Sequence, residues 1–97
     1  MSLHEKFREQ FVATATQRFH TITRALDGAH SNAMLDGVAS ELHTLGGEAS
    51  LLGALDIADL ARHGEEAARE RRPADLRAVL DQLEVAIFAQ DLARSGT

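Results

Sequence analysis

The stretch LDGVASELHTLGGEASLL, residues 35–52, decides the fold of this chain. Its apolar residues recur at intervals of three and four, which is the period of one face of an α-helix. They are Leu35, Val38, Leu42, Leu45, Ala49 and Leu52. The stretch therefore predicts an amphipathic helix that buries one face in a hydrophobic core. Ser31 and Asn32 precede it and are predicted N-caps, because short polar side chains accept hydrogen bonds from the first turn of a helix.

The sequence before this stretch predicts another helix of the same kind. Its apolar residues also step by three and four. They are Val12, Ala15, Phe19, Ile22 and Leu26. Phe7 and Phe11 form an i,i+4 pair on the flank of the same helix. We expect this helix to end near Gly28.

Two further helices are predicted after it. Gly53 and Ala54 mark a turn, and an alanine-rich series then indicates a third helix. Its members are Leu55, Ala58, Ala61 and Ala68. Pro73 follows a polar stretch and is typical of the first turn of a helix, where no backbone N–H is required. The apolar face of this fourth helix is predicted to carry Leu76, Val79 or Leu80, Leu83, Ile87 and, on its flank, Phe88.

The composition favours an all-α fold. The chain has 97 residues and is 44% apolar but only 4% aromatic, so its core must consist mainly of alanine and leucine. Both are strong helix formers, whereas the strand-favouring residues valine, isoleucine and tyrosine are scarce or absent. A chain of this length forms one hydrophobic core. We therefore predict that residues 1–97 form a single domain, an antiparallel four-helix bundle with up-down-up-down topology.

Charge and residue usage exclude several classes of function. Cysteine is absent, which excludes disulfides and thiolate chemistry. The net charge of −5, without a long run of lysine and arginine, counts against nucleic acid and membrane as partners. No apolar run resembles a signal peptide or a membrane span, so we expect a cytoplasmic protein. The other histidines, His4, His20, His30 and His63, lack the Glu-x-x-His spacing of bundle metal sites, so no metal is expected.

His43 is the candidate functional residue. At 100° per residue, its side chain points about 130° away from the mean direction of the apolar face, so we predict that it faces solvent. Its side of the helix carries mainly small side chains, which we expect to form a partner-docking surface. These residues are Ala39, Gly46, Gly47, Ser50 and Leu51.

The two adjacent glycines indicate that the space beside His43 is needed. Each glycine inside a helix costs about 1 kcal/mol relative to alanine. Gly47 lies one turn beyond His43, where a larger side chain would hinder a docking partner. Phosphoryl transfer requires such access, because the attacking and leaving atoms must lie roughly in line through phosphorus. An imidazole, with an ordinary pKa of roughly 6.5, offers a neutral nucleophilic nitrogen near neutral pH.

Residues 42–54, LHTLGGEASLLGA, resemble the signature of the histidine-phosphotransfer (HPt) domain family. His43, Gly47, Ala49, Ser50 and Gly53 match that signature. The signature lysine three residues after the histidine is replaced here by Gly46. Residues 54–65, ALDIADLARHGE, are similar to the family's third helix, with Gly64 where leucine is usual.

The resemblance implies that His43 accepts a phosphoryl group from a receiver-domain aspartate or a histidine kinase and passes it to another receiver aspartate. Such a protein is a phosphoryl carrier and not an enzyme with its own nucleotide site, and no phosphate-binding glycine-rich loop is present. No cofactor is expected on this chain, because the partner receiver would bind the magnesium. We expect a monomer in the cytoplasm.

Several alternatives stay open at this stage. The small residues also fit close helix packing, which would bury His43, and the chain could be a helical binding or dimerisation module without transfer. Arg62 or a partner residue could replace the missing lysine. Glu65 or Glu66 could orient His43, although carboxylates on so polar a helix are expected to be solvated. Phe7 and Phe11 fit either the core or a docking rim.

Overall fold

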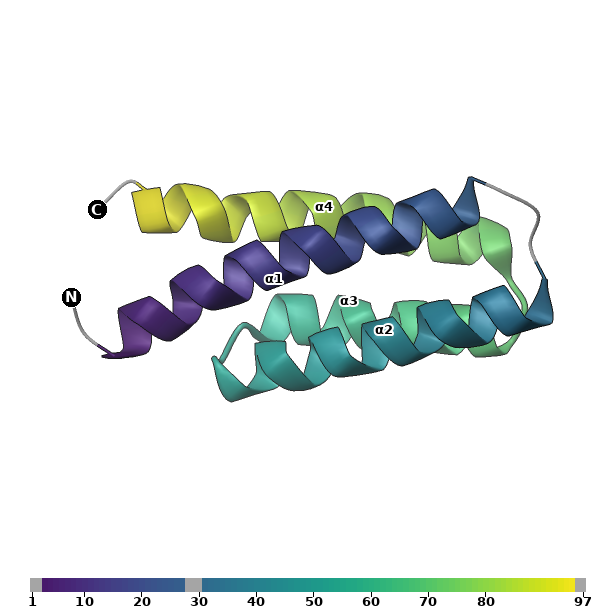
Figure 1. Ribbon diagram of the computed structural model, residues 1–97, viewed down its shortest axis with the longest axis horizontal. Helices are drawn as coiled ribbons and strands as arrows, with labels where there is room; N and C mark the ends of the chain where they lie inside the picture. The colour runs from purple at the N-terminus through teal and green to yellow at the C-terminus, as the bar shows by residue number, and fades with distance from the viewer. Residues whose placement is uncertain (1–2, 28–30, 96–97) are drawn as a thin grey trace.

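The computed structural model describes residues 3–27 and 31–95, which form four α-helices. They are α1 (Leu3–Leu26), α2 (Asn32–Leu51), α3 (Leu55–Arg69) and α4 (Pro73–Ser95). Successive helices run in opposite directions along an elongated bundle (Figure 1), which confirms the predicted antiparallel four-helix fold. The bundle measures 43 × 20 × 16 Å along its principal axes. None of the helices in the described part of the chain is both long and apolar enough to cross a membrane.

The helix ends follow from a few residues with special backbone or capping properties. Ser31 is the N-cap of α2, and its side-chain oxygen accepts a hydrogen bond from the backbone N–H of Met34 at 3.1 Å. Gly53 turns the chain between α2 and α3 with a φ of 75°, a conformation that side chains with a Cβ rarely adopt. Pro73 is the first residue of α4, as predicted. The first helix ends at Leu26, and Gly28 lies outside the described residues.

The core is built mainly from the residues that the periodicity selects. In α1 and α2 every predicted core residue is buried except Leu52, which is half-buried. In α4, Leu80 is buried and Val79 only partly, which settles the choice between the two. Phe88 is 59% exposed and does not belong to the core.

The predicted apolar face of α3 is wrong at its start. Leu55 is 69% exposed, whereas Ile57 is fully buried. Leu55 is the first residue of the helix, and the turn through Gly53 directs it away from the bundle axis, so the true face starts two residues later. Ala61 and Ala68 are buried as predicted, together with Gly64 and Ala67.

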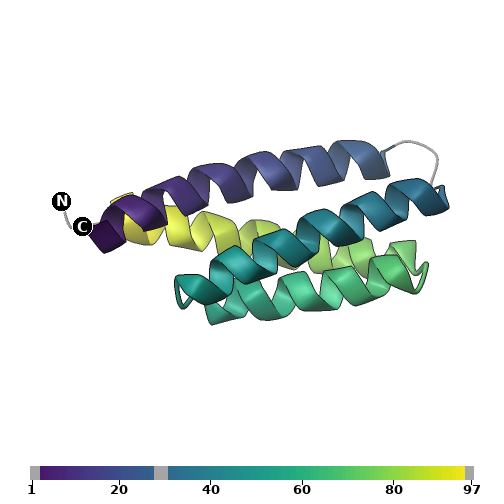
Figure 2. The ribbon, with the colours of Figure 1, turned by 60° about the horizontal axis from the view of Figure 1, so that its bottom comes forward.

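The most extensive helix packing is between α2 and α3. Gly64 on α3 is buried, and a Cβ built there would lie 3.0 Å from Leu42 Cδ1 and 3.4 Å from Val79 Cγ1. The missing side chain at Gly64 therefore lets α3 approach α2 and α4 together. Helix α1 runs along one side of the bundle (Figure 2) and packs against α2 and α4.

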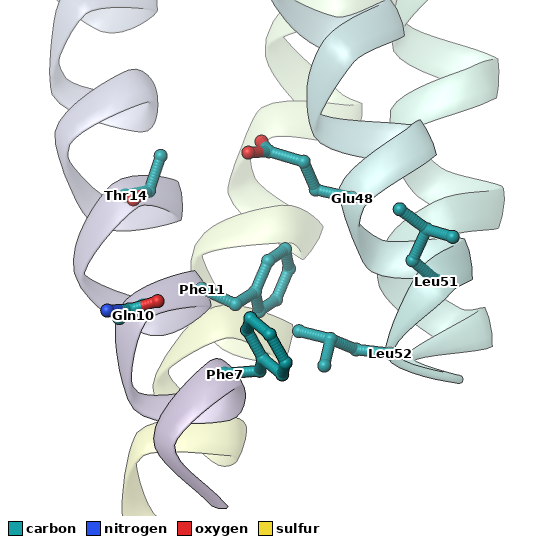
Figure 3. A pocket seen from close by; sticks show the side chains of 7 residues that line it. All are labelled: Phe7, Gln10, Phe11, Thr14, Glu48, Leu51 and Leu52. Carbon is teal, nitrogen blue, oxygen red and sulfur yellow. The ribbon is translucent and has the colours of Figure 1, made fainter. Parts of the chain in front are cut away.

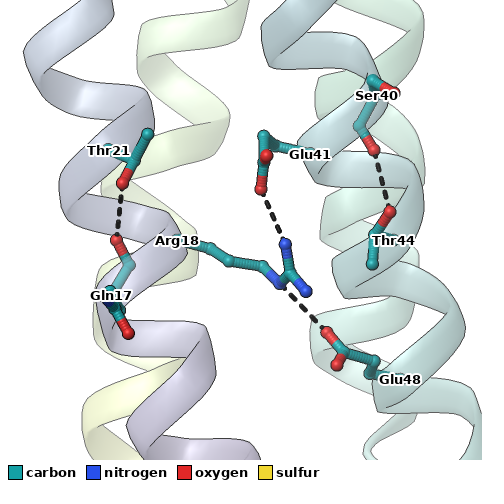
Figure 4. A network of polar contacts seen from close by, with 7 residues as sticks. All are labelled: Gln17, Arg18, Thr21, Ser40, Glu41, Thr44 and Glu48. Carbon is teal, nitrogen blue, oxygen red and sulfur yellow. Dashed lines mark hydrogen bonds and ion pairs between the residues drawn. The ribbon is translucent and has the colours of Figure 1, made fainter.

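An arginine on α1 fastens that helix to α2. Arg18 donates from NH1 to Glu41 at 2.8 Å and from Nε to Glu48 at 3.1 Å (Figure 4). The hydrogen bond to Glu41, opposed by partial burial and reinforced by the charge of Glu48, raises the pKa of the Arg18 guanidinium above its ordinary value. Arg18 therefore carries its full positive charge and links α1 to two carboxylates on α2.

Candidate functional site

His43 lies on α2 with its side chain 74% exposed, so the predicted exposure is observed. Its imidazole is nevertheless held by a neighbouring side chain. The ring atom Nδ1 lies 3.1 Å from Oε1 of Glu65, on the neighbouring helix α3. This contact fixes one edge of the ring and leaves the opposite nitrogen, Nε2, without a hydrogen-bond partner among the described residues.

Glu65 is held from both sides. Its second oxygen, Oε2, accepts a hydrogen bond from Arg69 Nε at 3.0 Å and forms an ion pair with Arg69 NH2 at 2.9 Å. Partial burial of the carboxyl opposes its ionisation, but the hydrogen bonds and charges of His43 and Arg69 outweigh this effect and lower the pKa of Glu65. The carboxyl is therefore ionised near neutral pH and can only accept hydrogen bonds.

An ionised carboxylate at Nδ1 determines the tautomer of the ring. Because Glu65 has no proton to donate, Nδ1 of His43 must carry the hydrogen of their hydrogen bond. In the neutral imidazole the lone pair then lies on Nε2. The arrangement consequently presents a nucleophilic nitrogen on the exposed side of the ring.

The interpretation of Glu65 as a solvated carboxylate is wrong. Its side chain is only 19% exposed and lies between His43 and Arg69. Glu65 follows the buried Gly64 directly, just as His43 follows the buried Leu42, but the sequence of either helix alone does not show that these positions meet. Two helices packed through Leu42 and Gly64 bring the next residue of each to the same groove.

A hollow of about 270 Å³ lies beside the histidine, between α2 and α3. Its lining residues are Leu42, His43, Gly46, Gly47, Ser50, Ala58, Arg62 and Glu65. Gly47 is exposed, and a Cβ built on it would meet nothing within 4 Å. A Cβ on Gly46 would lie 3.5 Å from the Cβ of Ala61 and 3.7 Å from the Ala58 carbonyl oxygen, so Gly46 forms the floor of the hollow.

The predicted docking surface needs one correction. Ala39 is fully buried and cannot contact a partner. The prediction assigned it to solvent because it lies one turn before His43, but α3 packs against that side of α2 and widens the buried arc of the helix. The packing explanation of the small residues is therefore right for Ala39, while Gly47 and Ser50 stay exposed.

An apolar groove of about 400 Å³ lies between α1 and the end of α2 (Figure 3). The side chains of Phe7, Phe11 and Leu52 point toward one another across it. Leu51, which also lines the groove, is 89% exposed, and Phe7 is 52% exposed. Phe11 belongs to the core at 6% exposure, which decides between its two alternatives, whereas a docking role of Phe7 stays a prediction.

His20 and His63, the other histidines whose side chains are described, do not form a second site. His20 stacks edge-on to Phe19, and His63 lies 3.9 Å from Asp59. In residues 3–27 and 31–95, no group of three histidine and acidic side chains converges as a metal site would require. The side chains of His4 and His30 lie outside the described part of the chain.

The fold and the site together define a class of protein, a four-helix bundle that presents one oriented histidine on an open helix face. The family model of the Hpt domain matches residues 6–94, and the chain belongs to this family. No curated protein and no solved structure gives a significant match. The match covers all four helices and so includes the parts of the chain outside the recognisable motif.

Proposed function

We propose that the protein is a phosphorelay intermediate that accepts a phosphoryl group on Nε2 of His43 and passes it to a receiver-domain aspartate. The single observation that carries the proposal is the hydrogen bond from His43 Nδ1 to Glu65 on an otherwise exposed ring. Family membership supports it, because Hpt domains act as phosphoryl carriers in two-component signalling. The donor is a receiver aspartyl phosphate or a histidine kinase.

The residues at the site supply the chemistry in one step. The Nε2 lone pair attacks phosphorus, the bond from phosphorus to the aspartate oxygen breaks, and the aspartate leaves as a carboxylate. The proton on Nδ1 stays in place, and the positive charge of the phosphorylated ring is offset by ionised Glu65. The same atoms moving in reverse return the phosphoryl group to an aspartate, so no general base is needed on this chain.

The surface around His43 suits a receiver domain. Gly47 and Ser50 leave the approach to the ring open, and exposed Leu51 continues toward the apolar groove lined by Phe7 and Leu52. We propose that the receiver's phosphorylation site faces His43 while one of its apolar surfaces covers Leu51 and the groove. Gly46, which forms the floor of the hollow, then lies under this interface.

The proposal assigns the remaining chemistry to the partner. The receiver binds the magnesium ion, and this chain carries the phosphoryl group as a monomer without a nucleotide or metal of its own. We expect the exchange to take place in the cytoplasm. A module that docks receivers without transfer, or a helical dimerisation unit, is the competing function.

One assay separates these functions. The chain is incubated with a receiver that carries a labelled phosphoryl group, and a label that is acid-labile and base-stable is expected on it. His43→Gln should abolish this label, whereas the matched control His63→Gln, at a histidine on α3 that is 49% exposed, should keep it. Failure of the wild-type chain to take label from any receiver would leave the docking or dimerisation function. Label that survives His43→Gln would place the phosphoacceptor elsewhere.

A further inference from the structure

A phosphoryl group on His43 creates a charge problem at this site. Like the phosphoryl group on other phosphorylated side chains, it adds roughly two negative charges beside the ring. The nearest charged neighbour of the ring is ionised Glu65, which repels those charges. One turn along α2, where a lysine would supply the balancing charge, the chain has Gly46. The neutralising cation must come from another helix.

The arginines around the site differ in how firmly they are held. Arg69 gives two nitrogens to Glu65, and Arg18 is held between two carboxylates on α2. Arg71 forms an ion pair with Asp36 and also donates hydrogen bonds to backbone carbonyl oxygens. Among the residues that line the hollow beside His43, the only cation is Arg62.

The present partner of Arg62 holds it weakly. Arg62 NH2 lies 2.7 Å from Asp59 Oδ1 one turn earlier on α3, with the two side chains 63% and 55% exposed. Exposed ion pairs within one helix contribute little, because water screens both charges. A dianionic phosphoryl group is a stronger partner for a guanidinium, since its oxygens accept two parallel hydrogen bonds. Exchange of Asp59 for the phosphoryl group is therefore favourable.

The floor between Arg62 and His43 leaves room for this exchange. Gly46, Gly47, Ser50 and Ala58 line the space between them, and none carries a side chain larger than a hydroxymethyl group. The absence of a side chain at Gly46 thus removes a cation and also opens the hollow toward α3.

We propose that Arg62 is the phosphate-binding residue of this chain, leaving Asp59 after transfer to pair with the phosphoryl oxygens on His43. In this arrangement a cation from α3 does what a lysine on α2 would otherwise do. The inference rests on the proposed function, because it concerns the phosphorylated state of His43. Its test nevertheless needs no partner protein.

The first experiment uses phosphoramidate, which phosphorylates histidine directly as its P–N bond breaks, the ring N–P bond forms and ammonia leaves. His43→Gln identifies which phosphorus NMR signal belongs to His43. A neighbouring cation favours the dianion, so Arg62 should lower the second pKa of the phosphoryl group. Arg62→Gln should raise this pKa by about half a unit, equal to about a threefold weaker preference for the dianion, and Arg62→Lys should raise it less. Arg77→Gln, which removes the same charge on α4 away from the hollow, should leave it unchanged.

A second-site variant separates charge from local structure. A Cβ on Gly46 would lie 3.5 and 3.7 Å from its nearest neighbours, which is ordinary van der Waals contact, so we expect Gly46→Lys to leave α3 in place. In the Arg62→Gln background, Gly46→Lys should restore the low phosphoryl pKa. A merely structural role of Arg62 would not be rescued by a cation on another helix.

The outcomes distinguish this inference from the function on which it rests. An unchanged phosphoryl pKa in Arg62→Gln, with circular dichroism that shows intact helices, would overturn the role of Arg62 even if receivers phosphorylate the chain. Conversely, a wild-type chain that takes no label from receivers would refute the relay, while the NMR titration would still report on the hollow. If the relay function and the role of Arg62 are both correct, Arg62→Gln should also shift the transfer equilibrium toward the receiver by about threefold.

Discussion

In the proposed transfer, the chemistry of His43 depends on Glu65, a residue that does not contact the phosphorus. Glu65 holds the hydrogen on Nδ1 and so leaves the lone pair on Nε2, on the exposed side of the ring. A free surface histidine would divide its neutral population between two tautomers and rotate about its side-chain bonds. The carboxylate therefore selects both the tautomer and the direction of attack.

Replacing Glu65 tests this role. Glu65→Gln keeps the size of the side chain but removes the charge that favours the phosphorylated ring, and the amide can also donate to Nδ1. We expect transfer from a receiver to slow by about tenfold, the effect of losing one charge-assisted hydrogen bond. Glu66→Gln, at the exposed neighbouring position, is the matched control and should transfer normally. Equal rates for both variants in a rapid-quench assay would contradict the role of Glu65.

The lowered pKa of Glu65 also has a consequence for stability. A carboxyl whose pKa is lower in the folded than in the unfolded state stabilises the fold above the unfolded pKa, about 4.3, and loses this effect as the pH falls through its folded pKa. The free energy of unfolding of the wild-type chain, measured with urea, should therefore fall in that acid range. In Glu65→Gln this part of the pH dependence should disappear, and identical pH profiles would contradict the assignment.

The open position at Gly47 gives a steric test. Gly47→Leu meets no neighbouring atom at its Cβ, so it should keep the fold and increase helix stability by up to about 1 kcal/mol. Its larger side chain should nevertheless cut transfer sharply, because it fills the approach to His43. Gly47→Ala is the matched control, with the same gain in stability and a smaller loss of transfer. Undiminished transfer by a stable Gly47→Leu chain would refute the steric argument.

At the scale of the helices, sequence patterns were reliable where a helix has one wide apolar face. Periodicity predicted α1, α2 and α4 with nearly all their buried residues. It failed at Leu55 and Ala39, for different reasons. Leu55 begins its helix, where the turn decides its direction, and Ala39 lies under α3, whose closeness to α2 depends on Gly64 across the interface. Neither position can be read from one helix alone.

The start of α2 rests on a single capping side chain. Ser31→Ala removes the hydrogen bond to the N–H of Met34 and should lower the free energy of unfolding by about 1 kcal/mol. Ser40→Ala makes the same chemical change at an exposed position inside α2, where alanine is the better helix former, and should raise it slightly. Urea denaturation of both variants checks the prediction, which fails if they change stability in the same direction.

At the scale of the whole molecule, the core and the site share the same contact. Leu42 directly precedes His43, and Gly64 directly precedes Glu65. The buried residues Leu42 and Gly64 contact each other between α2 and α3. The position of His43 followed from the sequence, because one helix decides its exposure. Its partner did not, because the pairing with Glu65 depends on how closely two helices approach. That distance is a property of the assembled bundle.

A larger residue at Gly64 should disturb both the core and the site. A Cβ at position 64 would already lie 3.0 Å from Leu42 Cδ1 and 3.4 Å from Val79 Cγ1, so we expect overpacking in Gly64→Val to cost about 1–3 kcal/mol of stability. The same displacement of α3 should break the hydrogen bond between His43 and Glu65, which is visible in the ring ¹⁵N shifts of His43. Gly37→Val, where a Cβ meets nothing within 4 Å, controls for helix propensity. If folded Gly64→Val showed normal ring ¹⁵N shifts for His43, the geometry of the site would not depend on the packing at Gly64.

The connection between α2 and α3 has a consequence for local unfolding. His43 and Glu65 lie on consecutive helices joined by only a short turn at Gly53, whereas α1 is fastened from outside by Arg18 and its apolar face. A fluctuation that detaches α1 exposes the groove around Phe11 without separating the histidine from its carboxylate. In hydrogen exchange, the amides of α1 should therefore open before those of the α2–α3 hairpin. The proposed docking surface can then loosen and reform while the ring of His43 stays oriented by Glu65.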